Sequence, residues 1–376
     1  MNVLITGGAG FIGTHLTRKL LMEQCTVTLL DNFSPQVHGQ CNNLQAEIAG
    51  RVRLIRGDVR DKLLVSDALK GQDVVVHLAA ETGTGQSMYE IGRYTEVNLD
   101  GTAVLFDCLV NGSYSVGKVV VASSRAIYGE GKYSCSEHGP VFPGPRIIED
   151  LANGQFEPRC HLCRHPITAL PTDESAPYAP SSYYGLTKQF QEQMVLMFSQ
   201  SLGISGYALR YQNVYGPGQS LLNPYTGILA IFSNLARTGK PIRIFEDGLE
   251  SRDFVFIDDV VEATWRCIRP ENKAVTAVNV GSGLQTTVLD VAHEIVEFFS
   301  SSSKIEITGE FRVGDIRHNL ADLRKSHAEI GYVPCWKFRE GVQAFLRWTE
   351  QQAIETDLYE ASLQEMRAKG LMHGKG

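Results

Sequence analysis

Three side chains in this sequence have the types and spacing for proton transfer: Ser124, Tyr184 and Lys188. Tyr184 and Lys188 stand at positions i and i+4, so a helix would place them on one face. A tyrosine has an ordinary pKa of about 10, and a nearby ammonium group lowers that pKa by favouring the phenolate. Ser124 follows an apolar run and could relay or share a substrate proton. The same spacing also occurs in ordinary pairs on a helix surface, so the surrounding fold decides between these interpretations.

A glycine-rich turn near the start of the chain predicts a dinucleotide site. Gly7, Gly10 and Gly13 lie between an apolar strand and a helical pattern, where glycines permit a tight turn and a close approach to pyrophosphate. The helix N-terminus would add amide donors for that anion. Asp31 ends the next strand, where a carboxylate accepts hydrogen bonds from the adenosine ribose and repels a 2′-phosphate. Because we find no basic residue beside Asp31 in the sequence, NAD is favoured over NADP.

The acidic residues at the ends of the second and third strands each have an alternative interpretation. Asp31 could be a simple turn residue. Asp58, which with Val59 ends the third apolar run, could meet the adenine amino group or could be ordinary turn chemistry after a glycine. If the dinucleotide is NAD, its positive nicotinamide ring would lower the pKa of Tyr184 further.

Alternating strands and helices would position these residues. The expected strands are the apolar runs 2–6, 27–30, 52–55, 74–78, 119–122 and 206–210. The expected helices are 11–21, a segment that starts near 183, 227–237, 258–268 and 288–299, with short strands at 242–245 and 278–280. Continuous apolar strands separated by helices indicate a parallel sheet that is covered on both faces. We therefore predict an α/β protein with a Rossmann-type doubly wound parallel sheet and a smaller C-terminal substrate-binding domain.

Composition narrows the possible partners and location. The 376 residues carry a net charge of -7 and no basic stretch, which argues against a nucleic-acid partner. No uncharged apolar run is long enough to span a bilayer, and the first residues lead into a strand instead of a signal peptide. We expect a cytoplasmic protein with no membrane partner. The eight cysteines are too few for a disulfide scaffold at this length.

Seven ordered motifs carry a family resemblance. They occupy residues 6–13, 77–80, 97–102, 123–129, 184–188, 209–217 and 252–260. With them the chain resembles the extended short-chain dehydrogenases/reductases of the NAD-dependent sugar-nucleotide epimerase/dehydratase group. The resemblance runs from residue 1 to about residue 332, apart from residues 131–171. It implies tightly bound NAD, a nucleotide-sugar domain and a homodimer formed through a four-helix interface.

The resemblance also assigns roles to single residues. The expected cofactor contacts are Gly7, Gly10, Phe11, Ile12, Gly13, Asp31, Asn32, Asp58, Val59, Leu78, Ala79, Ala80, Asn98, Tyr184 and Lys188. The expected contacts with a pyrimidine nucleotide-diphosphate sugar are Thr82, Ser124, Asn213, Ile244, Phe245, Arg252, Arg312 and Asp315. Among these, Arg252, Arg312 and Asn213 match diphosphate ligands, and Asp315 matches a nucleotide-ribose ligand. Arginine suits this role because its planar group bonds phosphate oxygens bidentately; the alternative is that both arginines are solvated surface charges.

The domains implied in this way are interleaved. Residues 1–215 would bind NAD and residues 216–346 mainly the nucleotide sugar, with residues 250–283 returning to the first domain. Residues 347–376 would form a polar helical tail, which we expect to be frayed and to which we assign no role.

The residues after Ser124 favour one reaction within the family. In the 4,6-dehydratases, the Ser/Thr at this position is followed by an Asp-Glu pair that eliminates water, whereas here Arg125 and Ala126 follow. The chain therefore resembles the 4-epimerases, in which NAD takes a hydride from C4 of the sugar and returns it to the other face. Alternatives are a 4-ketoreductase with exchangeable cofactor and a non-catalytic NAD-sensing protein, although relatives of the latter kind lose the Tyr/Lys pair.

The substrate class is suggested by a finer resemblance. Thr82 stands where UDP-galactose epimerases carry a lysine. With the segment 223–227 and the cysteine-bearing insertion, this makes the chain more similar to bacterial epimerases of dTDP-6-deoxyhexoses, such as those acting on dTDP-L-rhamnose. A UDP-glucose/UDP-galactose 4-epimerase is the alternative.

The insertion 131–171 is rich in Pro, Gly, Cys and His, and we expect a long loop without regular structure. It contains a Cys-x2-His pair, Cys135 and His138, and a Cys-x2-Cys pair, Cys160 and Cys163. Together they predict a closed, structural zinc site, with His161 and His165 as substitutes for His138. The alternative is four unrelated residues in a flexible loop. The remaining cysteines, 25, 41, 108, 267 and 335, are scattered.

Overall fold

The computed structural model describes residues 1–40, 42–221, 223, 225, 227–354 and 359–374. Some expectations fall elsewhere: Cys41, Pro224 and Thr226 lie outside the described residues, as do residues 355–358 and 375–376 of the tail. In the part that is described, no helix has the length and apolar character needed to cross a membrane.

A seven-stranded sheet forms the centre of the molecule, in the order β14-β9-β5-β4-β1-β2-β3. Its strands are β1 (Asn2–Thr6), β2 (Thr26–Asp31), β3 (Arg53–Arg56), β4 (Val74–His77), β5 (Lys118–Ser124), β9 (Ser205–Tyr211) and β14 (Val275–Val280). Every pair of neighbouring strands is parallel. Parallel strands need crossover connections, and helices between most of the strands provide them.

Helices cover both faces of this sheet. Along β1, Val3 and Ile5 belong to one hydrophobic core and Leu4 to another, as expected when successive side chains point to opposite faces. The first core includes residues of α1 (Phe11–Met22) and α10 (Ile257–Ile268). The second includes residues of α3 (Lys62–Leu69), α6 (Gly101–Asn111) and α8 (Tyr183–Leu202). The predicted doubly wound α/β fold is confirmed, with the predicted strands present within a few residues of their expected bounds.

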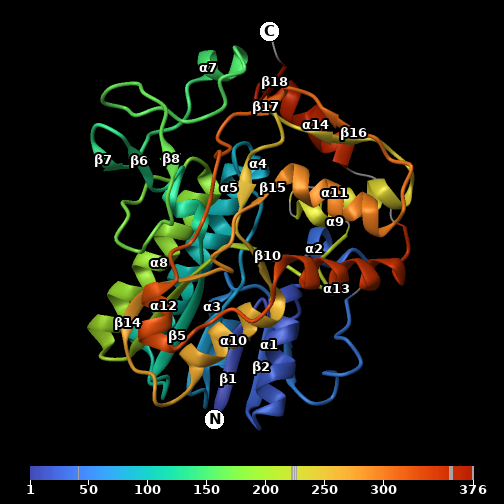
Figure 1. Ribbon diagram of the computed structural model, residues 1–376. Coiled ribbons are helices and arrows are strands. Elements are labelled where there is room, and N and C mark those ends of the chain that lie inside the picture. Colours follow the sequence, from blue (N-terminus) through green and yellow to red (C-terminus); the bar gives the residue numbers. More distant parts are fainter. Residues whose placement is uncertain (41, 222, 224, 226, 355–358, 375–376) are drawn as a thin grey trace.

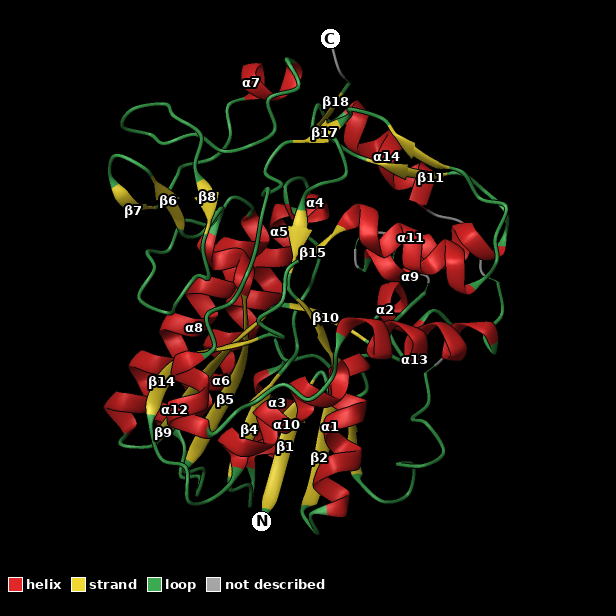
Figure 2. Cartoon of the chain, in the orientation of Figure 1, coloured by secondary structure: helices red, strands yellow, loops and turns green. Residues whose placement is uncertain are grey.

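A second, smaller group of elements lies beyond the carboxyl ends of the sheet strands (Figures 1 and 2). It contains α9 (Ile228–Arg237), α11 (Val288–Phe298), α13 (Phe338–Glu350), β11 (Ile242–Ile244) and β16 (Ile305–Ile307). Short strand pairs join it to the sheet region: β10 (Asn213–Tyr215) with β13 (Phe254–Phe256), and β12 (Ser251–Arg252) with β15 (Thr286–Thr287). The remaining short helices are α2 (Pro35–His38), α4 (Thr84–Ser87), α5 (Ile91–Tyr94), η1 (Thr95–Asp100), η2 (Arg125–Tyr128) and α12 (Arg324–Ile330). The predicted domain boundaries remain a prediction.

The insertion is not the unstructured loop that we expected. It forms a three-stranded antiparallel sheet of β6 (Tyr133–Cys135), β7 (Gly139–Val141) and β8 (Thr168–Ala169), together with the short helix α7 (Ile148–Ala152). Figure 1 places it at the upper left. The expectation was wrong because strands of two or three residues leave no periodic pattern, and their stability depends on a small buried cluster that includes Tyr133, Val141 and Ile167.

The described part of the tail is also more ordered than we expected. Helix α14 (Tyr359–Ala368) buries Leu363 and Met366 against Tyr89 and Phe245. Strand β18 (Met372–His373) then pairs antiparallel with β17 (Phe311–Arg312). The expectation of a frayed tail was wrong because its apolar residues pack on partners far away in the sequence, which a polar composition does not reveal.

Candidate functional site

A large cavity of about 650 Å³ lies at the carboxyl ends of the sheet strands, between the sheet and the smaller group of elements. Ligands bind at this edge in open α/β sheets. All the residues predicted to contact cofactor or substrate line this cavity except Asn98. The four predicted metal ligands lie outside it, in the insertion.

The glycine turn between β1 and α1 leaves space that a side chain would fill. A Cβ atom on Gly13 would lie 2.7 Å from the carbonyl oxygen of Gly7, and one on Gly7 would lie 2.8 Å from the backbone nitrogen of Ala79. Gly7 also has a φ of +68°, which favours glycine. Helix α1 begins after Gly10 without a side-chain cap, so its first amides are available to an anion. The turn therefore fits the pyrophosphate of NAD.

Asp31 sits at the end of β2, where the carboxylate is held by the protein. Its Oδ2 accepts a hydrogen bond from the backbone N–H of Ala9 at 2.9 Å, and its Oδ1 accepts one from Phe33 at 2.8 Å. His38 Nε2 lies 3.6 Å from Oδ1, so the expectation that no basic residue stands nearby was wrong. His38 was missed because α2 brings it back toward the strand end. The fixed carboxylate still opposes a 2′-phosphate.

Asp58 faces the same end of the cavity. Its carboxylate accepts hydrogen bonds from Asn32 Nδ2 at 2.9 Å and from Arg60 Nε at 2.8 Å. Although burial raises the pKa of Asp58, the bonds from Arg60 and Asn32 outweigh it and hold that pKa at about 2. Asp58 is therefore an anion at neutral pH, able to accept from an adenine amino group.

Tyr184, Lys188 and Ser124 converge on the cavity from two elements. Helix α8 begins with Ser182, whose hydroxyl accepts from the N–H of Gly185 at 3.2 Å, and it carries Tyr184 in its first turn. The backbone N–H of Tyr184 donates to Ser87 Oγ at 2.9 Å. Lys188 is buried and its Nζ donates to the carbonyl oxygen of Ala122 at 3.1 Å. Ser124 ends β5, whose neighbouring strands lie on both sides, so all three side chains are held by the core.

The pKa values of Tyr184 and Lys188 in the protein alone are set mainly by burial. Burial raises the pKa of Tyr184, and this outweighs the hydroxyl of Ser124 and the guanidinium of Arg125, which lower it. Burial also lowers the pKa of Lys188 to about 7. Without the nicotinamide ring, burial of the phenol therefore dominates its pKa, and the expected lowering by Lys188 together with bound NAD remains a prediction. An anionic or cationic ligand in the cavity would shift both equilibria.

Asn98 is the one predicted cofactor ligand that does not line the cavity. Its side chain accepts from the backbone N–H of Glu81 at 2.7 Å and donates to the carbonyl oxygen of Glu81 at 3.1 Å and to Thr187 Oγ1 at 2.9 Å. These bonds occupy the buried amide in the protein alone, and the contact of Asn98 with the cofactor remains a prediction. Asn98 joins the loop after β4 to helix α8, and so helps to position Tyr184.

Three of the predicted substrate residues, Arg252, Arg312 and Asp315, are already held by hydrogen bonds or an ion pair. Arg252 donates to the carbonyl oxygens of Arg317 and Ile316 at 3.0 and 2.9 Å. Arg312 pairs with Asp315 through Nε at 2.8 Å and Nη2 at 2.7 Å. Its guanidinium also lies over the ring of Phe245, 5.2 Å from the centroid.

One polar atom of this region points to a ligand. Asn213 Oδ1 is buried and has no hydrogen-bond partner among the described residues. A buried acceptor of this kind costs stability unless something donates to it. The hydroxyl or amide of a bound nucleotide sugar could do so, as could an ordered water.

Several cavity residues were missed from the sequence. Arg125 lies near both Tyr184 and Arg252, and burial together with the charge of Arg252 lowers its pKa to about 10. Tyr225 and Tyr359 also line the cavity. Arg125 could have been found as a cation directly after Ser124, whereas Tyr359 comes from the tail and gave no signal.

The profile of the NAD dependent epimerase/dehydratase family matches residues 3–158 and 164–281, and the chain belongs to that family. A dTDP-L-rhamnose 4-epimerase from Burkholderia thailandensis is 38% identical over 357 residues, which cover 93% of this chain and 95% of the relative. The structure resembles a UDP-glucose 4-epimerase from Thermotoga maritima with UDP-glucose (TM-score 0.76, 27% identity, 93% and 99% coverage). It also resembles the Thermus thermophilus UDP-glucose 4-epimerase complex with NAD (TM-score 0.73, 26% identity, 94% and 100% coverage).

Family membership confirms several predictions. The resemblance to sugar-nucleotide epimerases of the extended short-chain dehydrogenase/reductase type is confirmed, as is an enzyme of the isomerase class. NAD is the cofactor of the family, and the glycine turn and Asp31 fit it.

Proposed function

We propose that this enzyme is a nucleotide-sugar 4-epimerase that inverts C4 through a transient 4-keto sugar. The observation that carries the proposal is the wall of the cavity around Tyr184: the residue after Ser124 is the cation Arg125 and not an acid. The dehydratases of this family use an acid pair at that position to eliminate water. A site that holds the Tyr/Lys/Ser group without this pair supports oxidation and reduction at one carbon and no elimination.

Each side chain around the C4 hydroxyl would have a separate role in the proton transfer. Tyr184 would remove the proton of the C4 hydroxyl and later return it, while Ser124 holds that hydroxyl in reach. Lys188 would stabilise the phenolate, because a positive charge near an anion favours its formation. Arg125 adds a second cation near the phenol. Bound NAD would supply the hydride acceptor and donor. Because the reaction has no net redox change, the cofactor can remain bound throughout.

The substrate that we propose is a dTDP-6-deoxyhexose such as dTDP-L-rhamnose. Two observations support it: the 38% identical relative is a dTDP-L-rhamnose 4-epimerase, and Thr82 replaces the lysine of the UDP-galactose epimerases at the cavity wall. The diphosphate would meet Arg252, Arg312 and Asn213, and Asp315 would meet the nucleotide ribose. UDP-glucose or UDP-galactose is the second candidate, favoured by the similarity to the UDP-glucose 4-epimerase structure.

The test is direct. Purified protein is incubated with dTDP-L-rhamnose and, separately, with UDP-glucose and UDP-galactose, and the C4 proton signals are followed by NMR without added cofactor. We expect inversion at C4 of dTDP-L-rhamnose. Inversion of the UDP sugars alone would move the assignment to the second candidate. Consumption of substrate only when NADH or NADPH is supplied would replace the epimerase by a ketoreductase.

We also propose a homodimer formed through α6 and α8. Leu186, Phe190 and Met197 on α8 and Val110 on α6 are large apolar side chains with between 39% and 55% of their surface exposed. On α8 they recur at a spacing that makes a stripe, which a second copy could cover. Light scattering should give twice the chain mass, and Phe190→Glu should give a monomer; a monomeric parent protein would contradict the proposal.

A cytoplasmic location remains a prediction.

A further inference from the structure

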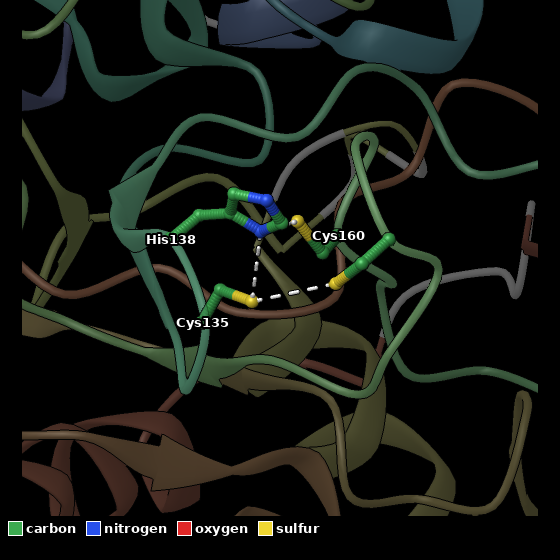
Figure 3. A group of neighbouring side chains, drawn as sticks. Cys135, His138 and Cys160 are labelled. Carbon is green, nitrogen blue, oxygen red and sulfur yellow. Dashed lines mark hydrogen bonds between the residues drawn. The ribbon is translucent and has the colours of Figure 1, made fainter.

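Four side chains of the insertion form a compact group outside the cavity. The sulfurs of Cys135, Cys160 and Cys163 and a ring nitrogen of His138 all lie within 4.8 Å of one another. Cys135 Sγ is 3.6 Å from His138 Nδ1 and 3.6 Å from Cys163 Sγ, and Cys160 Sγ is 3.6 Å from the same Nδ1. Figure 3 shows Cys135, His138 and Cys160 pointing toward one another. Zn–S and Zn–N bonds of about 2.3 and 2.0 Å place tetrahedral ligands about 3.5 to 3.8 Å apart, so these distances fit one zinc ion.

The backbone at the two pairs repeats the same local structure. Gly139 follows the Cys-x2-His pair with a φ of +66°, and Arg164 follows the Cys-x2-Cys pair with a φ of +63°. Left-handed φ is uncommon in a residue such as Arg164. At the second pair, the N–H of Arg164 donates to the carbonyl oxygen of Cys160 at 2.8 Å, which closes the turn. Two separate turns thus direct two pairs of ligand side chains toward one point.

Neither a disulfide nor an acidic site fits this group as well as a bound metal does. A disulfide between Cys135 and Cys163 would need a sulfur–sulfur distance of about 2.0 Å, and theirs is 3.6 Å. Glu137 and His165 come near Cys163, but they pair with each other at 2.8 Å on the exposed side. Two thiols of the group, those of Cys135 and Cys160, are buried. Without a metal, the close approach of the other ligand atoms would add little stability to these buried thiols.

We propose that Cys135, His138, Cys160 and Cys163 bind one zinc ion in a closed, structural site. Three thiolates and one imidazole fill a tetrahedral shell and leave no position for water or substrate. His161, which the sequence offered as a substitute ligand, belongs to neither group of candidate ligands found among the described residues. The metal would join β6 to the turn before β8 and so fix both ends of the segment that runs between them.

That segment reaches the proposed nucleotide end of the cavity. Arg146 lies between the two ligand pairs and is buried; its guanidinium donates to the carbonyl oxygen of Asp315 at 2.9 Å and to Glu246 at 2.9 Å. Asp315 and Glu246 both line the cavity. Glu157, in the same segment, pairs with Arg317 at 2.6 Å. Fixing the segment therefore fixes part of the cavity wall, which makes Arg146 a positioning residue that depends on the metal.

The first experiment measures the metal alone. Protein purified without chelator is analysed for metals by mass spectrometry, and we expect about one zinc per chain, as a closed site with four protein ligands requires. Cys160→Ser and His138→Ala should lose most of the zinc, whereas the control Cys335→Ser, an exposed cysteine elsewhere, should keep it. Zinc at background level in the parent protein, or zinc retained by both ligand variants, would overturn the proposal.

A second measurement covers the case in which the ligand variants do not fold. The parent protein is stripped with a chelator and titrated with Co²⁺, whose absorption should show thiolate-to-metal charge transfer and tetrahedral ligand-field bands. Zinc should displace the cobalt. A spectrum of octahedral, oxygen-ligated cobalt would overturn the proposal.

The link to the cavity rests on the proposed function and has its own readout. Arg146→Met should keep its zinc but raise KM for the nucleotide sugar about tenfold with little change in kcat, the effect of losing one charged hydrogen bond. Zinc removal should raise KM in the same way. An unchanged KM in both cases would overturn the positioning role and leave the metal site standing. If no nucleotide sugar is turned over, the proposed function fails, while the metal analysis still decides the site.

Discussion

Replacing Lys188 by methionine should stabilise the protein while abolishing its activity. Burial lowers the pKa of this lysine from 10.5 to about 7, so the unfolded chain binds a proton more readily than the folded one. At pH 7 this difference costs the folded protein about 4 kcal/mol, since each pKa unit is worth about 1.4 kcal/mol and the group is half protonated when folded. Methionine loses the hydrogen bond to Ala122, worth about 1 kcal/mol. The net gain should be about 3 kcal/mol.

The stability difference between the Lys188→Met variant and its parent should change with pH in one direction. Because the folded pKa lies below the unfolded one, the penalty is complete below pH 7 and fades as pH rises toward 10.5. At pH 10 it should be about 1 kcal/mol by the same arithmetic, so the advantage of the variant should vanish there. Lys188 also lowers the pKa of buried His77, after burial itself, to about 3, so this imidazole is neutral at both pH values and does not affect the comparison.

Urea unfolding of both proteins at pH 7 and pH 10, after removal of bound nucleotide, measures these differences. Lys70→Met is the control, because Lys70 is exposed and pairs with Asp67 at the surface; it should change stability by less than about 0.5 kcal/mol at either pH. A Lys188→Met protein that is less stable than its parent at pH 7, or whose advantage does not shrink with pH, would refute the reasoning from burial.

Three further predictions concern the cavity. Tyr184→Phe should lower turnover by about 10²- to 10⁴-fold, the usual worth of a general acid/base, and retain its NAD by absorbance; unchanged turnover would remove Tyr184 from the proton transfer. Gly13→Ala should lose bound NAD, because its Cβ would meet the carbonyl oxygen of Gly7 at 2.7 Å, whereas Gly117→Ala, with open space around it, should not; equal NAD content in the two proteins would contradict the fit. Deleting residues 359–374 should raise KM more than it lowers kcat, because it unpairs the strand of Arg312; an unchanged KM would show that the tail does not support the nucleotide end.

Local patterns were enough to predict the sheet and one end of the cavity. The strands and the turn at Gly7 to Gly13 are contiguous in sequence, and the geometry of a strand, a turn and a helix follows from neighbours alone. Tyr184 and Ser124 meet because both lie at element ends that the parallel sheet brings to one edge. Nothing beyond the order of the elements was needed to bring them together.

The features that were missed depend on distant pairing. The hydrogen bonds of Asn98 to Glu81 and Thr187 could not be foreseen, because no sequence motif distinguishes a residue at the cavity surface from one just behind it. Tyr359 lies on a helix whose buried face packs on Tyr89, about 270 residues earlier. His38 reaches Asp31 only because a short helix reverses the chain. Such contacts arise from packing, which local periodicity does not encode.

The position of β14 has a consequence for biosynthesis. This strand completes the sheet beside β9, yet its first residue, Val275, comes 64 positions after the end of β9 at Tyr211. At roughly 5 to 20 residues per second on the ribosome, β9 would wait about 3 to 13 s for its neighbour. During that time its apolar edge, with Tyr207 and Leu209, is open to pairing with other chains. An isolated fragment of residues 1–215 would keep this edge permanently, so we expect the two parts of the chain to be obtained in good yield only together.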